Sequence, residues 1–447
     1  MLRTKGALTA AAATALVLSS AAAASAETIT VRCAGPAATT GPTGLINAIN
    51  AANANPDKTT IKLDSGCAYV YRASNNTDGA DGPNALPIIS SPIEITGDSG
   101  GREAALIIRS AAAGTPEFRL FDVASNGNLT LKVITVSGGL TPDGADGSDG
   151  TSGGNGGNAP DGGGILNKGA LTLQHTTVTR NVTGDGGDGG DGSLMGGGNG
   201  GNGGNGAGIA NRGTTTTKDG STVSGNVAGN GGNGGNGNTD GGNGGNGGDG
   251  GGVFRSAGTT FVRESSTVSG NETGNGGDGG DGNTNGGNGG NGGNGGGNTT
   301  LGPTGAGSFV FELDGGNVLV AQNQTGDGGD GGDGNTAGGN GGNGGDGGGN
   351  YTNNSRLLSD KADTTSNTTG AGGAAGSPSG TAGQRGVGGG FASFGSTLTL
   401  HDGSVTFNSA RTGGGVYHRT TVLSVSGTKI NSNTPNNCDT PAPGCPA

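Results

Sequence analysis

Residues 162–181, GGGILNKGALTLQHTTVTRN, are followed at residues 183–206 by TGDGGDGGDGSLMGGGNGGNGGNG. Apolar and polar residues alternate in the first part, which is the period of a β-strand with one buried face. The second part is nearly all glycine, with Asp or Asn at every third position. Because this pair of segments recurs toward the C-terminus, it predicts a repeat protein and not a conventional globular domain.

The most regular marker of the repeat is a small apolar residue three positions before an asparagine. The asparagines follow one another at intervals of 45, 45, 52, 44, 41 and 25 residues. The last interval nearly lacks the glycine insert, so it gives a bare coil of about 25 residues, which suits two or three short strands joined by turns. The pairs are Val178/Asn181, Val223/Asn226, Val268/Asn271, Val320/Asn323, Val405/Asn408 and Ile430/Asn433, with Thr364/Asn367 as a weaker member.

Strand alternation places Leu171, Leu173 and Val178 on one face, and stacked coils would align such positions as inward ladders. The asparagines are expected to stack at a turn, where Asn tolerates the left-handed conformation and its amide can bond to the Asn of the next coil. Each coil is expected to begin with an apolar residue after a glycine cluster. These starting residues are Ile165, Ile209, Val253, Phe309, Tyr351, Phe391 and Val416.

The repeat GGG-[IV]-x-N-x-G-x-L-x-L…V-[ST]-x-N resembles that of secreted bacterial right-handed parallel β-helix proteins. These proteins are pectin-lyase-like in fold and related to the polymorphic outer-membrane and adhesin repeat type. Residues 44–56 are similar to the N-terminal capping segment of such proteins, although the usual charged Arg-Glu pair is missing. The resemblance implies an all-β solenoid with a short N-terminal capping helix. It does not fix the activity, because the family includes lyases, glycosidases and adhesins.

The N-terminal end of the chain carries a signal of export. Residues 1–26 contain Arg3 and Lys5, a short apolar run and the cleavage-site pattern Ala24-Ser25-Ala26, as in a secretory signal peptide. We therefore expect a secreted or cell-surface protein with no membrane span. The remaining chain is divided into a capping segment with the first strands (27–100), the coils with their inserts (101–435) and a C-terminal tail (436–447).

Four cysteines in an exported chain predict two disulfides. Proximity in the sequence pairs Cys33 with Cys67 and Cys438 with Cys445, one pair near each end.

The composition excludes a large core and a nucleic-acid partner. Glycine accounts for 112 of 447 residues, and only 28% of residues are hydrophobic, so a thin repeated core is expected. Loss of Arg3 and Lys5 with the signal segment shifts the formal net charge from −12 to −14. Such an acidic chain repels phosphate backbones.

Four glycine inserts are nearly equivalent: residues 184–206, 229–252, 274–297 and 326–349, with imperfect versions at 143–158 and 370–390. Their period of three matches a polyproline-II helix, in which a nine-residue arm would extend about 28 Å. Two interpretations stay open. The inserts are either flexible glycine loops or ordered hairpins whose backbones are hydrogen-bonded to one another.

No catalytic, cofactor-binding or metal-binding residues are predicted. The chain contains no Asp-Asp dipeptide and no Trp, and His175, His401 and His418 fall at outward or turn positions. The acids of the coils do not recur at one register: Asp219, Glu264, Glu312, Asp314 and Asp402.

We therefore expect a non-enzymatic protein that makes surface contact, in adhesion, envelope or matrix association, or glycan recognition, through its repetitive Gly-Asn/Asp array. One alternative is a carbohydrate-active enzyme, a polysaccharide lyase or glycosidase, on the same fold. Another is an ice- or crystal-binding surface, because the G-G-N tracts resemble the glycine-rich polyproline-II bundles of some antifreeze proteins.

Overall fold

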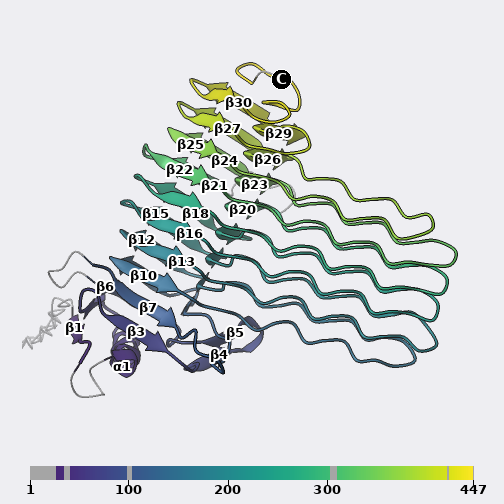
Figure 1. The fold of residues 1–447 in the computed structure, drawn as a ribbon. Coiled ribbons are helices and arrows are strands. Elements are labelled where there is room, and N and C mark those ends of the chain that lie inside the picture. The colour runs from purple at the N-terminus through teal and green to yellow at the C-terminus, as the bar shows by residue number, and fades with distance from the viewer. Residues whose placement is uncertain (1–26, 35–40, 98–102, 303–309, 420–421, 446–447) are drawn as a thin grey trace, which may run out of the picture.

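The chain forms a parallel β-helix from which long glycine-rich hairpins project to one side (Figure 1). The computed structural model describes residues 27–34, 41–97, 103–302, 310–419 and 422–445. The predicted signal peptide and Phe309 lie outside the described residues. Within them, the predicted β-helix with a short N-terminal helix is confirmed, because three long parallel sheets stack in sequence order.

Each regular coil contributes one strand to each of the three sheets. The first sheet contains β1 (Glu27–Val31), β2 (Thr59–Leu63), β6 (Pro92–Thr96), β9 (Asn128–Lys132), β12 (Ala170–Gln174), β15 (Thr214–Lys218), β18 (Thr259–Arg263), β21 (Val310–Asp314), β24 (Arg356–Asp360), β27 (Thr397–His401) and β30 (Val422–Ser426). The second sheet contains β3 (Ala68–Tyr71), β7 (Ala105–Arg109), β10 (Ile134–Ser137), β13 (Thr177–Thr179), β16 (Thr222–Ser224), β19 (Thr267–Ser269), β22 (Val318–Ala321), β25 (Ala362–Thr365), β28 (Ser404–Thr406) and β31 (Lys429–Asn431).

The third sheet is formed by the strands that follow the hairpins. It contains β8 (Phe121–Val123), β11 (Ile165–Asn167), β14 (Ile209–Asn211), β17 (Val253–Arg255), β20 (Asn298–Leu301), β23 (Asn350–Asn353), β26 (Phe391–Phe394) and β29 (Val416–Arg419). Near the N-terminus, β4 (Asn76–Asp78) and β5 (Gly82–Asn84) form an antiparallel pair, joined by the short 3₁₀ helix Gly79–Asp81.

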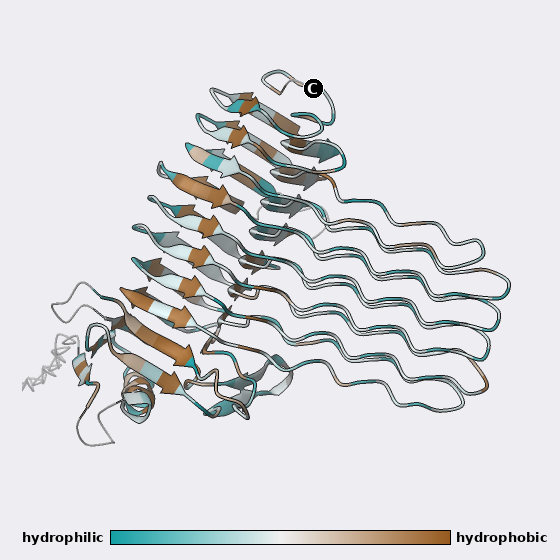
Figure 2. Cartoon of the chain, in the orientation of Figure 1, coloured by the Kyte–Doolittle hydropathy of each residue, from teal (hydrophilic) through white to brown (hydrophobic). Residues whose placement is uncertain are grey.

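The predicted inward ladders are present. Val178 pairs in parallel register with Val223, which pairs with Val268, and all three side chains are fully buried. Leu171 and Leu173 are buried in the same interior. Thr364 occupies the expected ladder position, between Val320 and Val405. Figure 2 shows that apolar residues are concentrated in the strands, whereas the hairpins are pale or hydrophilic.

The last coil confirms the predicted bare repeat. Val405 of β28 pairs with Ile430 of β31, so one complete coil takes 25 residues when the hairpin is replaced by a short turn. The coils that start with β9, β12, β15, β18, β21 and β24 therefore consist of the same three-strand unit with a hairpin inserted between the second and the third sheet.

Two details of the predicted coil were wrong. The coil that was expected to begin at Phe309 begins at β20, since Asn298 pairs with Val253. The following coil starts with Asn350, so the neighbouring Tyr351 does not occupy the inward position. Both errors have one cause: Asn298 and Asn350 replace apolar residues inside the helix, and Asn298 Nδ2 donates to Asn350 Oδ1 at 3.0 Å.

Helix α1 (Gly41–Asn53) covers the N-terminal end of the β-helix (Figure 1). Leu45, Ile49 and Ala52 are fully buried on its inner side. Asn53 Nδ2 donates to the carbonyl of Ile88 at 2.7 Å, which fixes the end of the helix to the chain beneath. The first predicted disulfide, Cys33–Cys67, joins the segment after β1 to the residue before β3.

An ion-pair network ties the β4–β5 pair to the coils. Lys168 Nζ lies 2.5 Å from a carboxylate oxygen of Asp78, 3.1 Å from one of Asp81 and 3.2 Å from one of Asp122. Arg212 joins Asp81 at 2.9 Å and Asp161 at 3.1 Å. The hydrogen bonds from Lys168 lower the pKa of Asp78. Burial, in contrast, raises the pKa of Asp122, whose side chain is fully buried.

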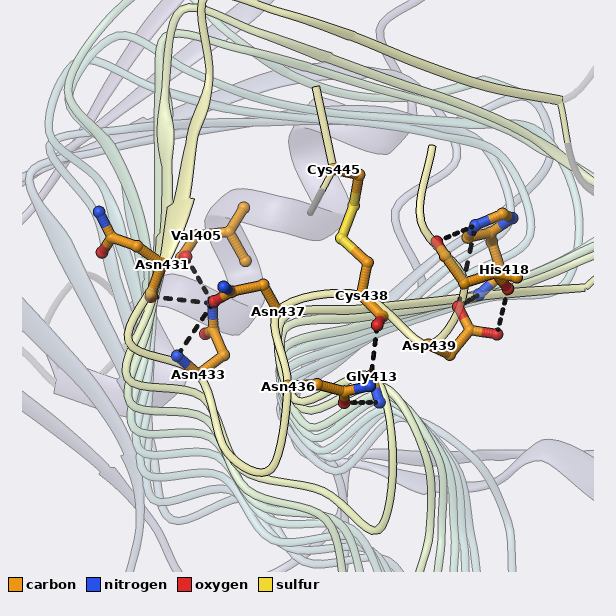
Figure 3. Close-up of a disulfide and its surroundings, with 11 residues drawn as sticks. Val405, Gly413, His418, Asn431, Asn433, Asn436, Asn437, Cys438, Asp439 and Cys445 are labelled. Atoms are coloured by element: carbon orange, nitrogen blue, oxygen red, sulfur yellow. Dashed lines mark hydrogen bonds and ion pairs between the residues drawn. A yellow bond between two sulfur atoms is a disulfide. The ribbon is translucent and has the colours of Figure 1, made fainter. Parts of the chain in front are cut away.

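The C-terminal tail covers the last coil (Figure 3). The second predicted disulfide, Cys438–Cys445, is confirmed, and both cysteines are buried. Asn436 Oδ1 accepts the Gly413 N–H at 2.7 Å, and Asp439 Oδ1 accepts the His418 N–H at 3.0 Å. The two disulfides indicate an oxidising compartment, either extracellular or periplasmic. Among the described residues, no helix is long and apolar enough to cross a membrane.

Candidate binding surface

The asparagine ladder fixes the corner from which the hairpins leave the coils. Asn181 Nδ2 donates to Asn226 Oδ1 at 2.9 Å, and the same contact repeats at 2.9 to 3.0 Å along the ladder. All its members are buried: Asn181, Asn226, Asn271, Asn323, Asn367, Asn408 and Asn433. The expected stacking is thus confirmed, but the expected left-handed conformation of these residues is wrong. The residue before each asparagine has the positive φ, as in Arg180 (54°) and Phe407 (57°).

Beyond this corner, successive glycine-rich segments lie side by side as hairpins (Figure 1). We number them from the N-terminus and call the stack the hairpin layer. Each has an outgoing arm, a short tip and a returning arm. Hairpins 1 to 6 comprise residues 143–161, 184–206, 229–250, 274–295, 326–347 and 370–388.

Within each three-residue repeat of an arm, the three backbone N–H groups donate to three different acceptors on neighbouring hairpins. In hairpin 3, Gly231 donates to Asn275 O of the next hairpin, and Gly232 donates to Gly201 O of the preceding one, both at 2.8 Å. The third N–H, that of Asn233, donates to the side-chain oxygen Oδ1 of Asp188 at 2.7 Å. Of the two interpretations left open by the sequence, the structure therefore shows the ordered hairpins, because pairing of nearly every amide offsets the entropy lost when the arms become ordered.

Glycine in the arms is required by the close approach of neighbouring backbones. Between the turns the arm glycines have no positive φ, so conformational freedom is not the reason for their presence. A Cβ atom on Gly232 would lie 2.1 Å from Gly187 O, and one on Gly242 would lie 1.8 Å from Gly198 O. Any side chain at such a position would separate the hairpins.

Threonines at the base of several hairpins join the layer to the β-helix. Thr183 Oγ1 donates to Gly204 O of its own hairpin at 2.6 Å and accepts the N–H of Gly229, the first residue of the next. Thr273 and Thr325 repeat both contacts. This role was not predicted from the sequence, although a signal is present there: a Thr directly precedes the glycine that begins each of these arms.

The outgoing arms place rows of exposed Asp and Asn side chains on one face of the layer, the outgoing face. Within each column, Oδ1 of one residue accepts the N–H of its successor in the next hairpin, as from Asp185 to Asp143 at 2.8 Å. A trough of about 450 Å³ with a glycine floor lies between two columns. The outgoing arms and tips carry no Lys, Arg or His. The acidic residues of this face are Asp143, Asp146, Asp149, Asp185, Asp188, Asp191, Asp278, Asp281, Asp327, Asp330 and Asp333.

The returning arms present mainly asparagine on the opposite face, the returning face. Asn243 accepts the Asn288 N–H at 2.8 Å, and Asn246 accepts the Asn291 N–H at 2.9 Å. Acids occur here only in the column nearest the β-helix, namely Asp161, Asp249 and Asp346. The two faces of one layer therefore differ in charge.

Two acids of this inner column have a raised pKa. Burial raises the pKa of Asp249 to about 6, although hydrogen bonds from Asn294 oppose the shift. Burial likewise raises the pKa of Asp346 to about 6. Each carboxylate takes the place that Asn205 and Asn294 hold in other hairpins, where no charge is buried.

The three histidines lie apart from one another. His401 Nδ1 is 2.6 Å from Asp360, which raises its pKa, and its side chain is exposed on the first sheet. His175 turns the chain between β12 and β13 with a φ of 46°, and His418 lies beside Asp439 at the C-terminal end. In the described part of the chain, no three His, Cys, Asp or Glu side chains are grouped in a way that could hold a metal ion.

Comparison of this chain with protein-family models, with curated proteins and with solved structures gave no match. The hairpin layer is therefore interpreted from its own geometry.

Proposed function

We propose that the protein is an exported, non-enzymatic β-helix that uses its hairpin layer for contact with an extended surface, such as a glycan, an envelope or a matrix. The finer resemblance to secreted bacterial β-helix proteins of the pectin-lyase-like and adhesin type is part of this proposal. One observation carries it. The side-chain oxygens of successive hairpins are held in columns by backbone N–H groups, as between Asn233 and Asp188 at 2.7 Å.

A surface of this kind favours many weak contacts over one deep pocket. Each exposed Asp or Asn already has one oxygen fixed by a hydrogen bond, so little side-chain freedom is lost when a partner binds. Repeated weak contacts then combine, because all of them belong to one rigid body. The acidic outgoing face and the amide-rich returning face would select different partners.

The test compares the mature protein with a hairpin-free variant. The chain supplies its own design, because residues 409–415 close the last coil without a hairpin. Hairpins 2 to 5 are each replaced by this turn, and both proteins are applied to a glycan array and to isolated cell envelopes. We expect binding by the mature protein and its loss in the variant. Equal binding of both proteins, or release of reducing ends or unsaturated products from polysaccharides, would contradict the proposal.

A second candidate is binding to an ice or crystal surface. The uncharged returning face favours it, because outside the inner column the interior hairpins 2 to 5 present only asparagine there. Thermal hysteresis and shaping of ice crystals by the mature protein would support this candidate, and their absence would exclude ice as the partner.

A further inference from the structure

The outermost hairpins break the glycine rule of the layer. In the arms of hairpins 2 to 5, beyond the tips, each glycine that faces a neighbouring hairpin has no room for a Cβ atom. Among the residues that the structure describes, hairpins 1 and 6 each have a neighbouring hairpin on one side only, and both carry side chains on the other side. These side chains belong to Ala145, Ser148, Ala382 and Arg385.

At the C-terminal edge, Ala382 and Arg385 stand where a seventh hairpin would pack. Ala382 corresponds to Gly341, because Thr381 and Asn340 are consecutive members of one column. A Cβ on Gly341 would lie 2.2 Å from Gly373 O, an atom of the next hairpin. By the same alignment Arg385 corresponds to Gly344, whose Cβ would lie 2.1 Å from Gly370 O.

Arg385 also occupies the base of the missing hairpin with its side chain. Its guanidinium donates to Thr369 O at 3.3 Å, to Ala410 O at 3.3 Å and to Ser409 Oγ at 2.9 Å. Ser409 and Ala410 follow the ladder residue Asn408, at the point where earlier coils begin a hairpin. The arginine is thus bonded to the short turn that replaces the hairpin.

The same edge lacks three of the six side-chain acceptors that a further hairpin would need, because only Ser377, Thr381 and Gln384 end their columns with an acceptor oxygen. Within the layer, an Asn or Asp side-chain oxygen of each column accepts the backbone N–H of the next hairpin. At this edge, however, two outgoing columns end in Ala371 and Ala374, and the inner returning column ends in Val387. None of these three side chains can accept a hydrogen bond.

The N-terminal edge shows the matching feature in the outgoing arm of hairpin 1, whereas the equivalent positions of its returning arm, Gly154 and Gly157, are glycine. Ala145 and Ser148 correspond to Gly187 and Gly190, since Asp143 and Asp185 are successive members of one column. A Cβ on Gly187 would lie 2.1 Å from Ala145 O in the preceding hairpin. The exposed side chains of Ala145 and Ser148 therefore point to the place that a hairpin before the first would take.

We propose that these four residues close both edges of the hairpin layer against any further glycine-rich hairpin, including one from a second copy of this chain. Unpaired backbone edges are templates for the addition of other chains. A head-to-tail contact that repeats would also generate fibres. Closed edges instead give each molecule a contact surface of fixed size, presented by one chain.

The test inserts a seventh hairpin in the full mature chain. A copy of residues 326–346 replaces Arg411 and Thr412, so the last coil carries a hairpin in register with hairpin 6. In the opened background, Ala382→Gly and Arg385→Gly remove both side chains, and Ala371→Asn with Ala374→Asn restores two acceptors. The matched control has the same two asparagines and Arg385→Ala but keeps Ala382, so it differs only by two Cβ atoms.

Amide hydrogen exchange of the inserted glycines is the readout. We expect exchange in the opened background to be slower by at least about a hundred-fold than in the control. Equal protection in the two backgrounds, whether high or low, would overturn the proposal. Sedimentation of the unaltered protein over a wide concentration range is the second measurement. We expect no association, and fibres that grow through the layer edges would also overturn it.

Discussion

The Asn181 side chain and backbone share one acceptor on Asn226: the side-chain Nδ2 and the backbone N–H of Asn181 lie 2.9 Å and 3.1 Å from Asn226 Oδ1. Asn226 in turn donates through Nδ2 to Val178 O at 3.1 Å. Each ladder residue thus closes the turn of one coil and joins it to the next. Because every group involved is buried, the ladder contributes to stability through the cost of leaving any of them unpaired.

Replacement of one asparagine in the middle of this ladder should therefore destabilise the protein. Asn271→Ala would leave the backbone N–H of Asn226 and one of the two N–H groups of its Nδ2 without an acceptor. At about 1–3 kcal/mol for each buried unpaired group, we expect a loss of about 2–5 kcal/mol in the free energy of unfolding, measured by denaturant titration. Asn243→Ala is the control: it also removes an Oδ1 acceptor, that of the Asn288 N–H, but both residues are exposed and water can replace the contact. An equal loss for both variants would contradict the argument.

The effect of replacing a glycine in the hairpin layer should depend on the position of that glycine. Gly232→Ala would place a Cβ 2.1 Å from a backbone oxygen and should cost about 3 kcal/mol or more, because neighbouring hairpins must separate. Gly157→Ala is the matched control at the N-terminal edge, where the new Cβ would lie 3.1 Å from the Ala145 nitrogen, a tight contact that a small shift of this outermost hairpin relieves.

Hydrogen exchange of the glycine amides measures both variants. We expect faster exchange across hairpins 2 to 4 for Gly232→Ala and nearly unchanged exchange for Gly157→Ala. Similar exchange in the two proteins would show that close packing is not the reason for glycine in the arms.

Local alternation and constant spacing were sufficient to predict the coils. Val178, Val223 and Val268 form a ladder because a one-residue shift would expose every inward side chain. The disulfides followed from proximity in the sequence, since Cys33 and Cys67 are 34 residues apart and Cys438 and Cys445 are 7 residues apart.

The hairpin layer could be predicted only as one of two alternatives. Its hydrogen bonds join residues about one coil apart, such as Asn233 and Asp188, so no local pattern fixes them. The predicted starts of two coils were wrong for another reason: buried Asn298 and Asn350 are hydrogen-bonded to each other and replace the apolar residue that was expected to mark the start. The left-handed position was misplaced by one residue, because the ladder needs the Asn side chain to point inward.

Stability should depend on pH through Asp249 and Asp346. Folding raises the pKa of each from 3.8 to about 6, so between these values the folded chain retains protons that the unfolded chain has released. The free energy of unfolding should therefore fall as the pH rises from about 4 to about 6, and the penalty should be complete above that range.

The double variant Asp249→Asn, Asp346→Asn tests this dependence, because asparagine already occupies the same column at Asn205 and Asn294. We expect a gain of about 1–2 kcal/mol per site at neutral pH, below the full 1.36 kcal/mol per pKa unit because both side chains are partly exposed. At pH 4 the gain should vanish. Thermal unfolding at both pH values is the measurement, and a gain of equal size at both would point to packing instead of charge.

The ion-pair network at Lys168 should be sensitive to the loss of its cation. Lys168→Met would leave the fully buried Asp122 carboxylate without its cation, and Asp78 and Asp81 would lose the same partner. Removal of one partner from a buried ion pair typically costs about 3–5 kcal/mol. Lys58→Met is the control: Lys58 is 55% exposed, and its partner Glu94 keeps a second contact with Lys132 at 3.1 Å. We expect a loss below about 1 kcal/mol for this exposed pair. Denaturant titration of both variants measures the loss in the free energy of unfolding. A loss for Lys168→Met no larger than that for Lys58→Met would show that the network does not hold the β4–β5 pair to the coils.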